Sequence, residues 1–261
     1  MKLSSYFKKL FKNEERLLSP RNENKLSKDQ ENLFCRNGLS KLQYNIVDNS
    51  CSTVQEEMNS LFSLTTINEY RELIRMGKTS YYGKTDKWLY KALNSFPISG
   101  ESSVIFGSAN PWYEAVSLEY GVRNCYVIEY SPRPTFSDKI IYMNPSDQHE
   151  IKYDSGISIS SFEHDGLGRY GDPLNPDGDL EAMDNAKKVI KKDGLLYLSV
   201  PIGKDMICFN THRIYGKNRL PLLLKGWRIE KSFGFSDKDL NNTKNSASCT
   251  PYQPVFVLRN L

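Results

Sequence analysis

The sequence has no apolar run near the ~20 residues that a membrane-spanning helix requires. Its first residues also lack the continuous apolar segment of a secretory signal. Both absences favour a soluble, cytoplasmic protein. Because 39% of the 261 residues are hydrophobic and 12% are aromatic, the chain can build a sizeable core, and disorder over most of its length is excluded.

Cysteine is scarce and unclustered. The five cysteines are odd in number and form no CxxC pair, so the sequence indicates neither a disulfide framework nor a zinc site. Two of them, Cys125 and Cys208, lie in apolar, strand-like surroundings and are expected to be buried free thiols.

A concentrated basic face is also missing. The net charge is +4, and acidic and basic residues alternate through most of the chain, which argues against nucleic acid as a partner. The exception is residues 1–12, MKLSSYFKKLFK, where apolar residues recur at helical spacing between lysines. This segment predicts a short basic helix that either contacts an anionic membrane surface peripherally or packs on its own domain.

Three regions follow one another along the chain. Residues 1–50 combine this amphipathic helix with a polar, turn-rich linker. Residues 51–97 show apolar positions three and four apart, which predicts helices packed on the main domain. In residues 98–261 short apolar runs alternate with helical patterns, which predicts one α/β domain.

The sequence predicts seven strands, at 102–107, 124–130, 139–143, 156–162, 195–203, 227–235 and 255–261. Helices are expected at 111–121 and 179–194, and a broken helix at 213–226. Such alternation indicates a Rossmann-like, mainly parallel sheet with helices on both faces, plus the N-terminal helical extension. Only the polar segment 236–253 separates the last two strands, so the final strand is expected to be antiparallel. Ligands of such sheets bind at the carboxyl ends of the strands.

Five segments carry a more specific signal: VIFGSANPWYEA, VIEYSPRP, SSFEHDGLGRYGDPLNPDGDLEAM, LLYLSVPIG and HRIYGKNRLPLLLKGW. They resemble a domain-of-unknown-function family within the class I S-adenosylmethionine-dependent methyltransferase-like superfamily, and EHDGLGRYGDP is the most specific of them. With the start of the sixth strand they cover about residues 100–235. The resemblance implies the fold described above, S-adenosylmethionine as the cofactor and methyl transfer as the reaction.

The resemblance also implies a cofactor turn at the end of the first strand, which reads GSANPWYE. Gly107, Ser108 and Ala109 would leave room for the methionine portion of the cofactor, because a Cβ at the glycine would collide with the ligand. Glu114 would supply a carboxylate from the following helix, and its alternative role is that of a solvated helix residue.

Glu129 ends the second strand, where the resemblance implies a ribose-binding acid. Its two carboxylate oxygens suit the two hydroxyls of a ribose. The turn departs from the family pattern, since Ala109 and Pro111 replace its later glycines and Ile105 replaces the acid of the first strand. These departures put cofactor binding in question.

The stretch SSFEHDGLGRYGDPLNPDGD, residues 160–179, follows the fourth strand and is expected over the ligand crevice. His164 is a candidate general base because an unperturbed imidazole, with a pKa of ~6.5, is mostly neutral at pH 7. Glu163 or Asp165 would fix its tautomer, and Arg169 would clamp a phosphate or a carboxylate.

Further residues are predicted to line the acceptor pocket: Asp172 from the same loop, and His212 and Arg213 after the fifth strand. Asp177 and Asp179 are instead expected to cap turns and the next helix. Histidines and acids of this region could ligate a divalent ion, but their spacing fits no ligand motif, so no metal site is predicted.

Two hypotheses therefore stand. The first is a methyltransferase acting on a small polar or carbohydrate hydroxyl, with a small molecule or glycan as acceptor. The second is a methyltransferase-like module that has lost the cofactor and serves in binding or scaffolding. A weaker third is a metal-dependent hydrolase built on Glu163, His164 and Asp165.

Overall fold

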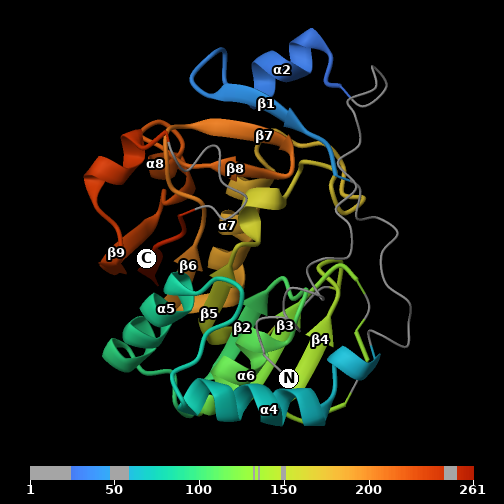
Figure 1. The fold of residues 1–261 in the computed structure, drawn as a ribbon, viewed down its shortest axis with the longest axis vertical. Helices are drawn as coiled ribbons and strands as arrows, with labels where there is room; N and C mark the ends of the chain where they lie inside the picture. Colours follow the sequence, from blue (N-terminus) through green and yellow to red (C-terminus); the bar gives the residue numbers. More distant parts are fainter. Residues whose placement is uncertain (1–24, 48–58, 132, 135, 148–150, 244–251) are drawn as a thin grey trace.

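The computed structural model describes residues 25–47, 59–131, 133–134, 136–147, 151–243 and 252–261 (Figure 1). The helix predicted for residues 1–12 lies outside these ranges. Within them, no helix is both long and apolar enough to cross a membrane.

The large sheet has seven strands in the order β4-β3-β2-β5-β6-β10-β9. Five of them pair in parallel, and β10 pairs antiparallel with both β6 and β9. Their bounds are β2 Ser102–Phe106, β3 Asn124–Ile128, β4 Ile140–Met143, β5 Tyr153–Ile159, β6 Ile190–Ser199, β9 Trp227–Phe233 and β10 Val255–Asn260. The predicted Rossmann-like sheet with an antiparallel final strand is confirmed, and all seven predicted strands are present.

Helices cover both faces of this sheet because side chains alternate along each strand. From β2, Ile105 packs with α4 Leu64–Arg75, α5 Lys84–Ser95 and α6 Trp112–Glu119. Its neighbours Val104 and Phe106 pack on the other face with α7 Gly178–Val189 and α8 Leu220–Leu223. The expected free thiol Cys125 is fully buried in the first of these layers.

A second, three-stranded sheet lies beyond the carboxyl ends of the large one, at the top of Figure 1. β1 Lys41–Asn45 pairs in parallel with β7 Met206–Asn210, which pairs antiparallel with β8 His212–Ile214. Helix α2 Lys28–Phe34, which begins with a capping box between Ser27 and Gln30, packs Phe34 edge-on against Phe209. Cys208, in β7, is buried and free as expected.

The small sheet corrects two expectations. The stretch predicted as a linker contains α2 from Lys28 onward, and the predicted broken helix at 213–226 begins as strand β8. The two corrections have different causes. α2 carries a local signal, the capping box between Ser27 and Gln30. β8 forms as the antiparallel partner of β7, whose other partner, β1, lies more than half of the chain away.

The helix predicted to run to residue 194 ends at Val189, and β6 begins at Ile190. The side-chain amide of Asn260 donates hydrogen bonds to the carbonyls of Lys187 (2.9 Å) and Ile190 (2.8 Å). These carbonyls are therefore satisfied without a further helical turn. Two short 3-10 helices, Phe162–His164 and Asp237–Asn241, complete the described elements.

Candidate functional site

The candidate site lies at the carboxyl edge of the large sheet, where β2, β3 and β5 end next to one another. β2 delivers Gly107 and Ser108, β3 delivers Glu129, and β5 delivers the loop that starts at Ser160. Parallel pairing thus brings together residues that are far apart in the sequence. Two clusters result, one around Ser108 and one around Arg213.

The turn after β2 is tied to the end of β3. Gly107 has a φ of +78°, a conformation that favours glycine, and a Cβ there would lie 2.5 Å from Ser161 Oγ, so that side chain would have to move. The Ser108 N–H donates to Glu129 Oε2 (2.7 Å), and the Ser131 N–H donates to Glu129 Oε1 (3.0 Å). Each carboxylate oxygen therefore keeps unused acceptor capacity, since a carboxylate offers about four lone-pair sites.

Arg133 is a residue of this cluster that the sequence analysis did not select. Its guanidinium donates two hydrogen bonds to the Ser108 carbonyl (3.1 and 2.7 Å) and lies 3.7 Å from Glu129 Oε2. It also stacks over the Phe62 ring, 4.8 Å from its centroid. The one feature of the sequence that could have pointed to Arg133 is its position four residues after Glu129, the acid at the end of β3.

Glu114 points inward. Its Oε1 accepts hydrogen bonds from Ser108 Oγ (2.5 Å) and Tyr142 OH (3.2 Å), while Oε2 has no partner among the described residues. The side chain is fully buried, and burial raises its pKa to about 7 despite these hydrogen bonds. Glu114 is therefore not a solvated helix residue. It accepts a hydrogen bond from the Ser108 hydroxyl and so fixes the position of that side chain. Ala109, in contrast, is exposed.

Glu163, in the 3-10 helix that follows β5, is fully buried. Its Oε1 accepts a hydrogen bond from Ser160 Oγ (2.6 Å), which itself accepts one from the Gln253 side-chain amide (3.0 Å). Glu163 Oε2 has no partner in the described part of the chain, and burial raises the pKa of this carboxyl to about 7. Gln253 was not predicted as a site residue, since the polar segment before β10 has no strand pattern.

His164 is held in one orientation. Its Nδ1 lies 2.5 Å from the Thr211 carbonyl, so Nδ1 carries the proton, and Nε2, the acceptor nitrogen, lies 3.7 Å from Glu163 Oε1. The Thr211 carbonyl, and not Glu163 or Asp165 as predicted, therefore fixes the tautomer. Burial, followed by the positive charge of Arg169, lowers the pKa of this imidazole to about 3. The same causes lower the pKa of His212 to about 4. Both histidines are therefore neutral at pH 7.

Asp165 is partly buried, and burial raises its pKa to about 8, against the lowering effect of Arg213. Tyr130, directly after Glu129, is the neighbour that links the two clusters. Burial raises its pKa, and so do the nearby negative charges of Asp165, Asp172 and Glu129. Charges from both clusters therefore act on the Tyr130 hydroxyl.

Asp172 organises its own loop. Its carboxylate accepts hydrogen bonds from the backbone N–H groups of Gly166 (2.8 Å), Gly168 (3.1 Å) and Tyr170 (3.2 Å). A Cβ on Gly166 would lie 2.2 Å from the Asn175 carbonyl oxygen, so this glycine permits close approach of two backbone segments.

Arg213 is fully buried at the centre of the same loop. Its guanidinium donates to the carbonyls of Asp165 (2.6 Å) and Asn175 (3.1 Å) and lies 3.5 Å from Asp179. Asp179 was expected to cap a helix, but it is fully buried and accepts two hydrogen bonds from Arg219 (2.9 and 2.5 Å). The N-cap of α7 is Asp177.

Arg169 is mostly buried, and its guanidinium stacks over Tyr170, 5.2 Å from the ring centroid. Within the described ranges, no three His, Cys, Asp or Glu side chains come together as metal ligands. The structure thus gathers the residues predicted for the cofactor near Ser108, and those predicted for catalysis and for the acceptor around Arg213.

A family profile described as "Caenorhabditis protein of unknown function, DUF268" matches residues 100–261. The chain belongs to this family. The match begins just before β2 and includes every strand of the large sheet. No curated protein matches the sequence.

Solved structures with a similar fold include S-adenosylmethionine-dependent methyltransferases. The N-methyltransferase NodS from Bradyrhizobium japonicum WM9, in complex with S-adenosyl-L-homocysteine, is 15% identical, with a TM-score of 0.44 over 68% of this chain and 85% of NodS. A methyltransferase from Clostridium acetobutylicum ATCC 824 is 9% identical, with a TM-score of 0.46 over 75% of this chain and 98% of that one. Likenesses of this degree identify neither a reaction nor a substrate for this chain.

Proposed function

We propose that this DUF268 protein is an S-adenosylmethionine-dependent methyltransferase that acts on a hydroxyl of a small polar or carbohydrate acceptor. The observation that carries the proposal is the placement of Glu129. Its carboxylate stands at the end of β3, held by the N–H of Ser108 from the neighbouring strand end. It keeps acceptor capacity for a vicinal diol.

The residues present fit the cofactor in its ribose part. Glu129 would hold the ribose hydroxyls, and Gly107, Ser108 and exposed Ala109 would border the rest of the cofactor. Glu114 would act through Ser108, whose hydroxyl it binds. When bound, the cofactor supplies a methyl group on a positively charged sulfur.

Asp165 is the proposed proton acceptor. Methyl transfer requires that the acceptor hydroxyl lose its proton, and a base works best when its pKa is near the working pH. The pKa of Asp165 is about 8, whereas that of His164 is about 3, which makes the imidazole a poor base. Glu163 is fully buried beside the loop. It would influence the charge of Asp165 and His164 rather than contact the acceptor.

A carbohydrate acceptor is proposed from the rim of the site. Tyr130 and Tyr170 expose 59% and 47% of their surface, and flat aromatic faces of this kind can stack on sugar rings. Arg169, His212 and Asp172 would border this acceptor, while Arg213 would position the loop through its backbone hydrogen bonds. Peripheral membrane contact through residues 1–12 remains a prediction from sequence.

Arg133 favours the second candidate, a cofactor-free binding module. Its guanidinium lies beside Glu129 and covers the Ser108 carbonyl, so the protein's own side chains satisfy part of the turn. The two candidates differ in one measurable property, which is affinity for the cofactor.

Calorimetric titration with S-adenosylmethionine and S-adenosylhomocysteine separates them. We expect binding that weakens about 10- to 100-fold in Glu129→Ala, because hydrogen bonds to a charged group contribute about 1.5–3 kcal/mol. Glu69→Ala is the matched control, since Glu69 is an exposed glutamate of α4, and should bind like the wild type. A folded wild-type protein that binds neither compound would leave the binding-module candidate standing.

A further inference from the structure

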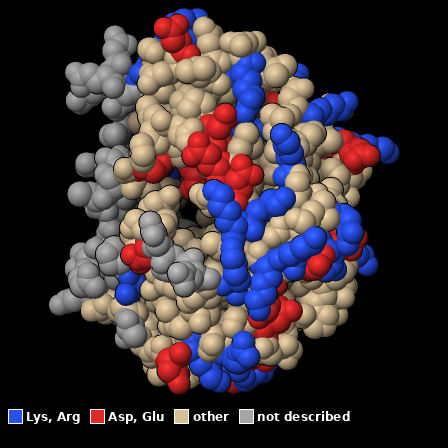
Figure 2. All heavy atoms as spheres, turned by 180° about the vertical axis from the view of Figure 1, so that it is seen from behind, with Lys and Arg blue, Asp and Glu red and all other residues tan. Residues whose placement is uncertain are grey.

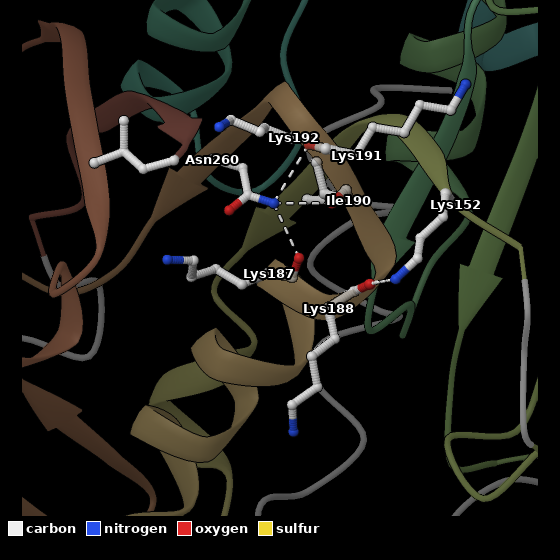
Figure 3. Close-up of a pocket in the computed structure, with 8 residues that line it drawn as sticks. Lys152, Lys187, Lys188, Ile190, Lys191, Lys192 and Asn260 are labelled. Atoms are coloured by element: carbon white, nitrogen blue, oxygen red, sulfur yellow. Dashed lines mark hydrogen bonds between the residues drawn. The ribbon is translucent and has the colours of Figure 1, made fainter.

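The opposite edge of the large sheet carries a feature that the proposed function does not use. A hollow of about 480 Å³ opens at the amino edge, lined by Lys152, Lys187, Lys188, Ile190, Lys191, Lys192, Asn260 and Leu261 (Figure 3). Five of these eight residues are lysines and none is an acid. On the face seen from behind in Figure 2, Lys and Arg side chains also gather in a band.

The backbone that carries four of the five lysines, at the end of α7 and the start of β6, is held in place by hydrogen bonds. The Asn260 amide donates to the carbonyls of Lys187, Ile190 and Lys191 (2.9, 2.8 and 3.3 Å), which ties the end of α7 and the start of β6 to the end of β10. Lys152 donates to the Lys188 carbonyl as well. The segment KKVIKK therefore presents its charges from the junction of α7 and β6 rather than from a loop.

Little negative charge offsets these amines. Lys191 pairs with Asp154 (2.5 Å). In the part of the chain that the structure describes, no carboxylate lies within salt-bridge distance of the other four lysines. Lys188 and Lys192 are exposed. Lys187 Nζ donates to the Gly226 carbonyl (2.8 Å) and Lys188 Nζ to Asn185 Oδ1 (3.0 Å). Both acceptors are neutral, so these amines keep their positive charge for a partner that brings negative charge.

The directions of the amines decide the kind of partner. In Figure 3, Lys187 and Lys192 extend to one side of the view, Lys191 to the opposite side and Lys188 away from both, so the four amines do not converge on one small anion. Spread charges fit an extended surface of repeated negative groups. Lysine acts as a point charge without fixed hydrogen-bond geometry, and each one near an anionic bilayer adds about 1 kcal/mol of attraction.

We propose that this lysine-lined amino edge docks on an anionic phospholipid surface, which leaves the carboxyl edge and its candidate site open to solvent. Nucleic acid is the less favoured partner. Its binding sites commonly combine arginine and aromatic side chains, and the lining of the hollow includes neither. The proposal is independent of methyl transfer and of residues 1–12.

Vesicle sedimentation of the full chain tests the proposal, with phosphatidylcholine vesicles that contain or lack phosphatidylserine. We expect binding only to the anionic vesicles, weakened about 25-fold in Lys188→Gln/Lys192→Gln, since each lysine contributes about fivefold. The matched control is Lys87→Gln/Lys91→Gln, an exposed lysine pair on α5, which removes the same charge from the other face of the sheet.

Three results would overturn the proposal. Equal weakening by both double variants would mean that net charge alone governs binding. Unchanged binding of Lys188→Gln/Lys192→Gln would assign the contact to another segment, such as residues 1–12. Tighter binding to duplex DNA than to anionic vesicles, lost in the same variant, would identify nucleic acid as the partner of this edge.

Discussion

At the scale of single residues, the candidate site is characterised by carboxyl groups whose pKa values burial raises to near 7 or 8. The pKa values of Glu114 and Glu163 are raised to about 7 and that of Asp165 to about 8, in each case chiefly by burial. The two histidines move the other way and stay uncharged. The proposed proton transfer therefore falls to a carboxyl group in the physiological pH range, although histidine is the residue that sequence reasoning favours for it.

Replacing Asp165 tests this assignment. If Asp165 accepts the proton, the rate of methyl transfer should rise about tenfold per pH unit below pH ~8, and Asp165→Asn should lower it by at least about 100-fold. His164→Asn keeps a donor for the Thr211 carbonyl and should retain most of the activity. The measurement is transfer of labelled methyl groups to pooled hydroxylated acceptors across pH. The reverse pattern, with His164→Asn inactive, would return the base role to His164.

At the scale of elements, the loop after β5 behaves as a folded unit. Arg213 binds its carbonyls from inside, and Asp172 binds its N–H groups. Gly166 stands where two of its backbone segments touch. The positions of the acidic side chains at the site therefore depend on backbone contacts that the loop makes with itself.

Gly166→Ala should destabilise the protein more than a comparable change elsewhere. Gly100 is the control, because its φ of +80° matches the +78° of Gly166 but nothing lies within 4 Å of its missing Cβ. Gly100→Ala should cost about 1–2 kcal/mol, the left-handed penalty alone. Gly166→Ala should cost at least ~2 kcal/mol more, because its Cβ meets the Asn175 carbonyl. Urea unfolding of both variants checks the difference, and equal costs would contradict the contact.

The elements also show what the sequence could predict. All seven strands of the large sheet were found because each is a compact apolar run bounded by turn residues. β1 was missed although KLQYN alternates polar and apolar residues, because the run is only five residues long and its partner β7 lies far along the chain.

The residues of the candidate site also fall into those that the sequence located and those whose contacts it could not predict. Strand ends located Gly107, Glu129 and the loop after β5, since their positions follow from the sheet order. The contacts of Arg133 and Arg213 could not be predicted, because their partners are backbone carbonyls that only the folded chain brings into reach. An arginine in sequence indicates a surface or a ligand, whereas Arg213 is fully buried.

At the scale of the whole molecule, the two edges of the sheet have opposite character. Buried acids gather at the carboxyl edge, and exposed lysines gather at the amino edge. The acids also link folding to pH. A carboxyl whose folded pKa is raised holds its proton in the native state, so it stabilises the fold at low pH and loses that contribution as pH rises through the folded pKa.

The free energy of unfolding should therefore fall by ~3 kcal/mol between pH 6.5 and pH 8.5, as Glu114, Glu163 and Asp165 lose protons. Below pH ~6.5 the two histidines oppose this trend, because only the unfolded chain protonates them. Glu114→Gln should reduce the fall by ~1 kcal/mol, and Glu69→Gln, on the exposed side of α4, should leave it unchanged. Urea unfolding across this pH range measures both. Stability that rises toward pH 8.5 would mean that these carboxyls are ionised in the native state and bind cationic partners, which would remove the basis for Asp165 as a base.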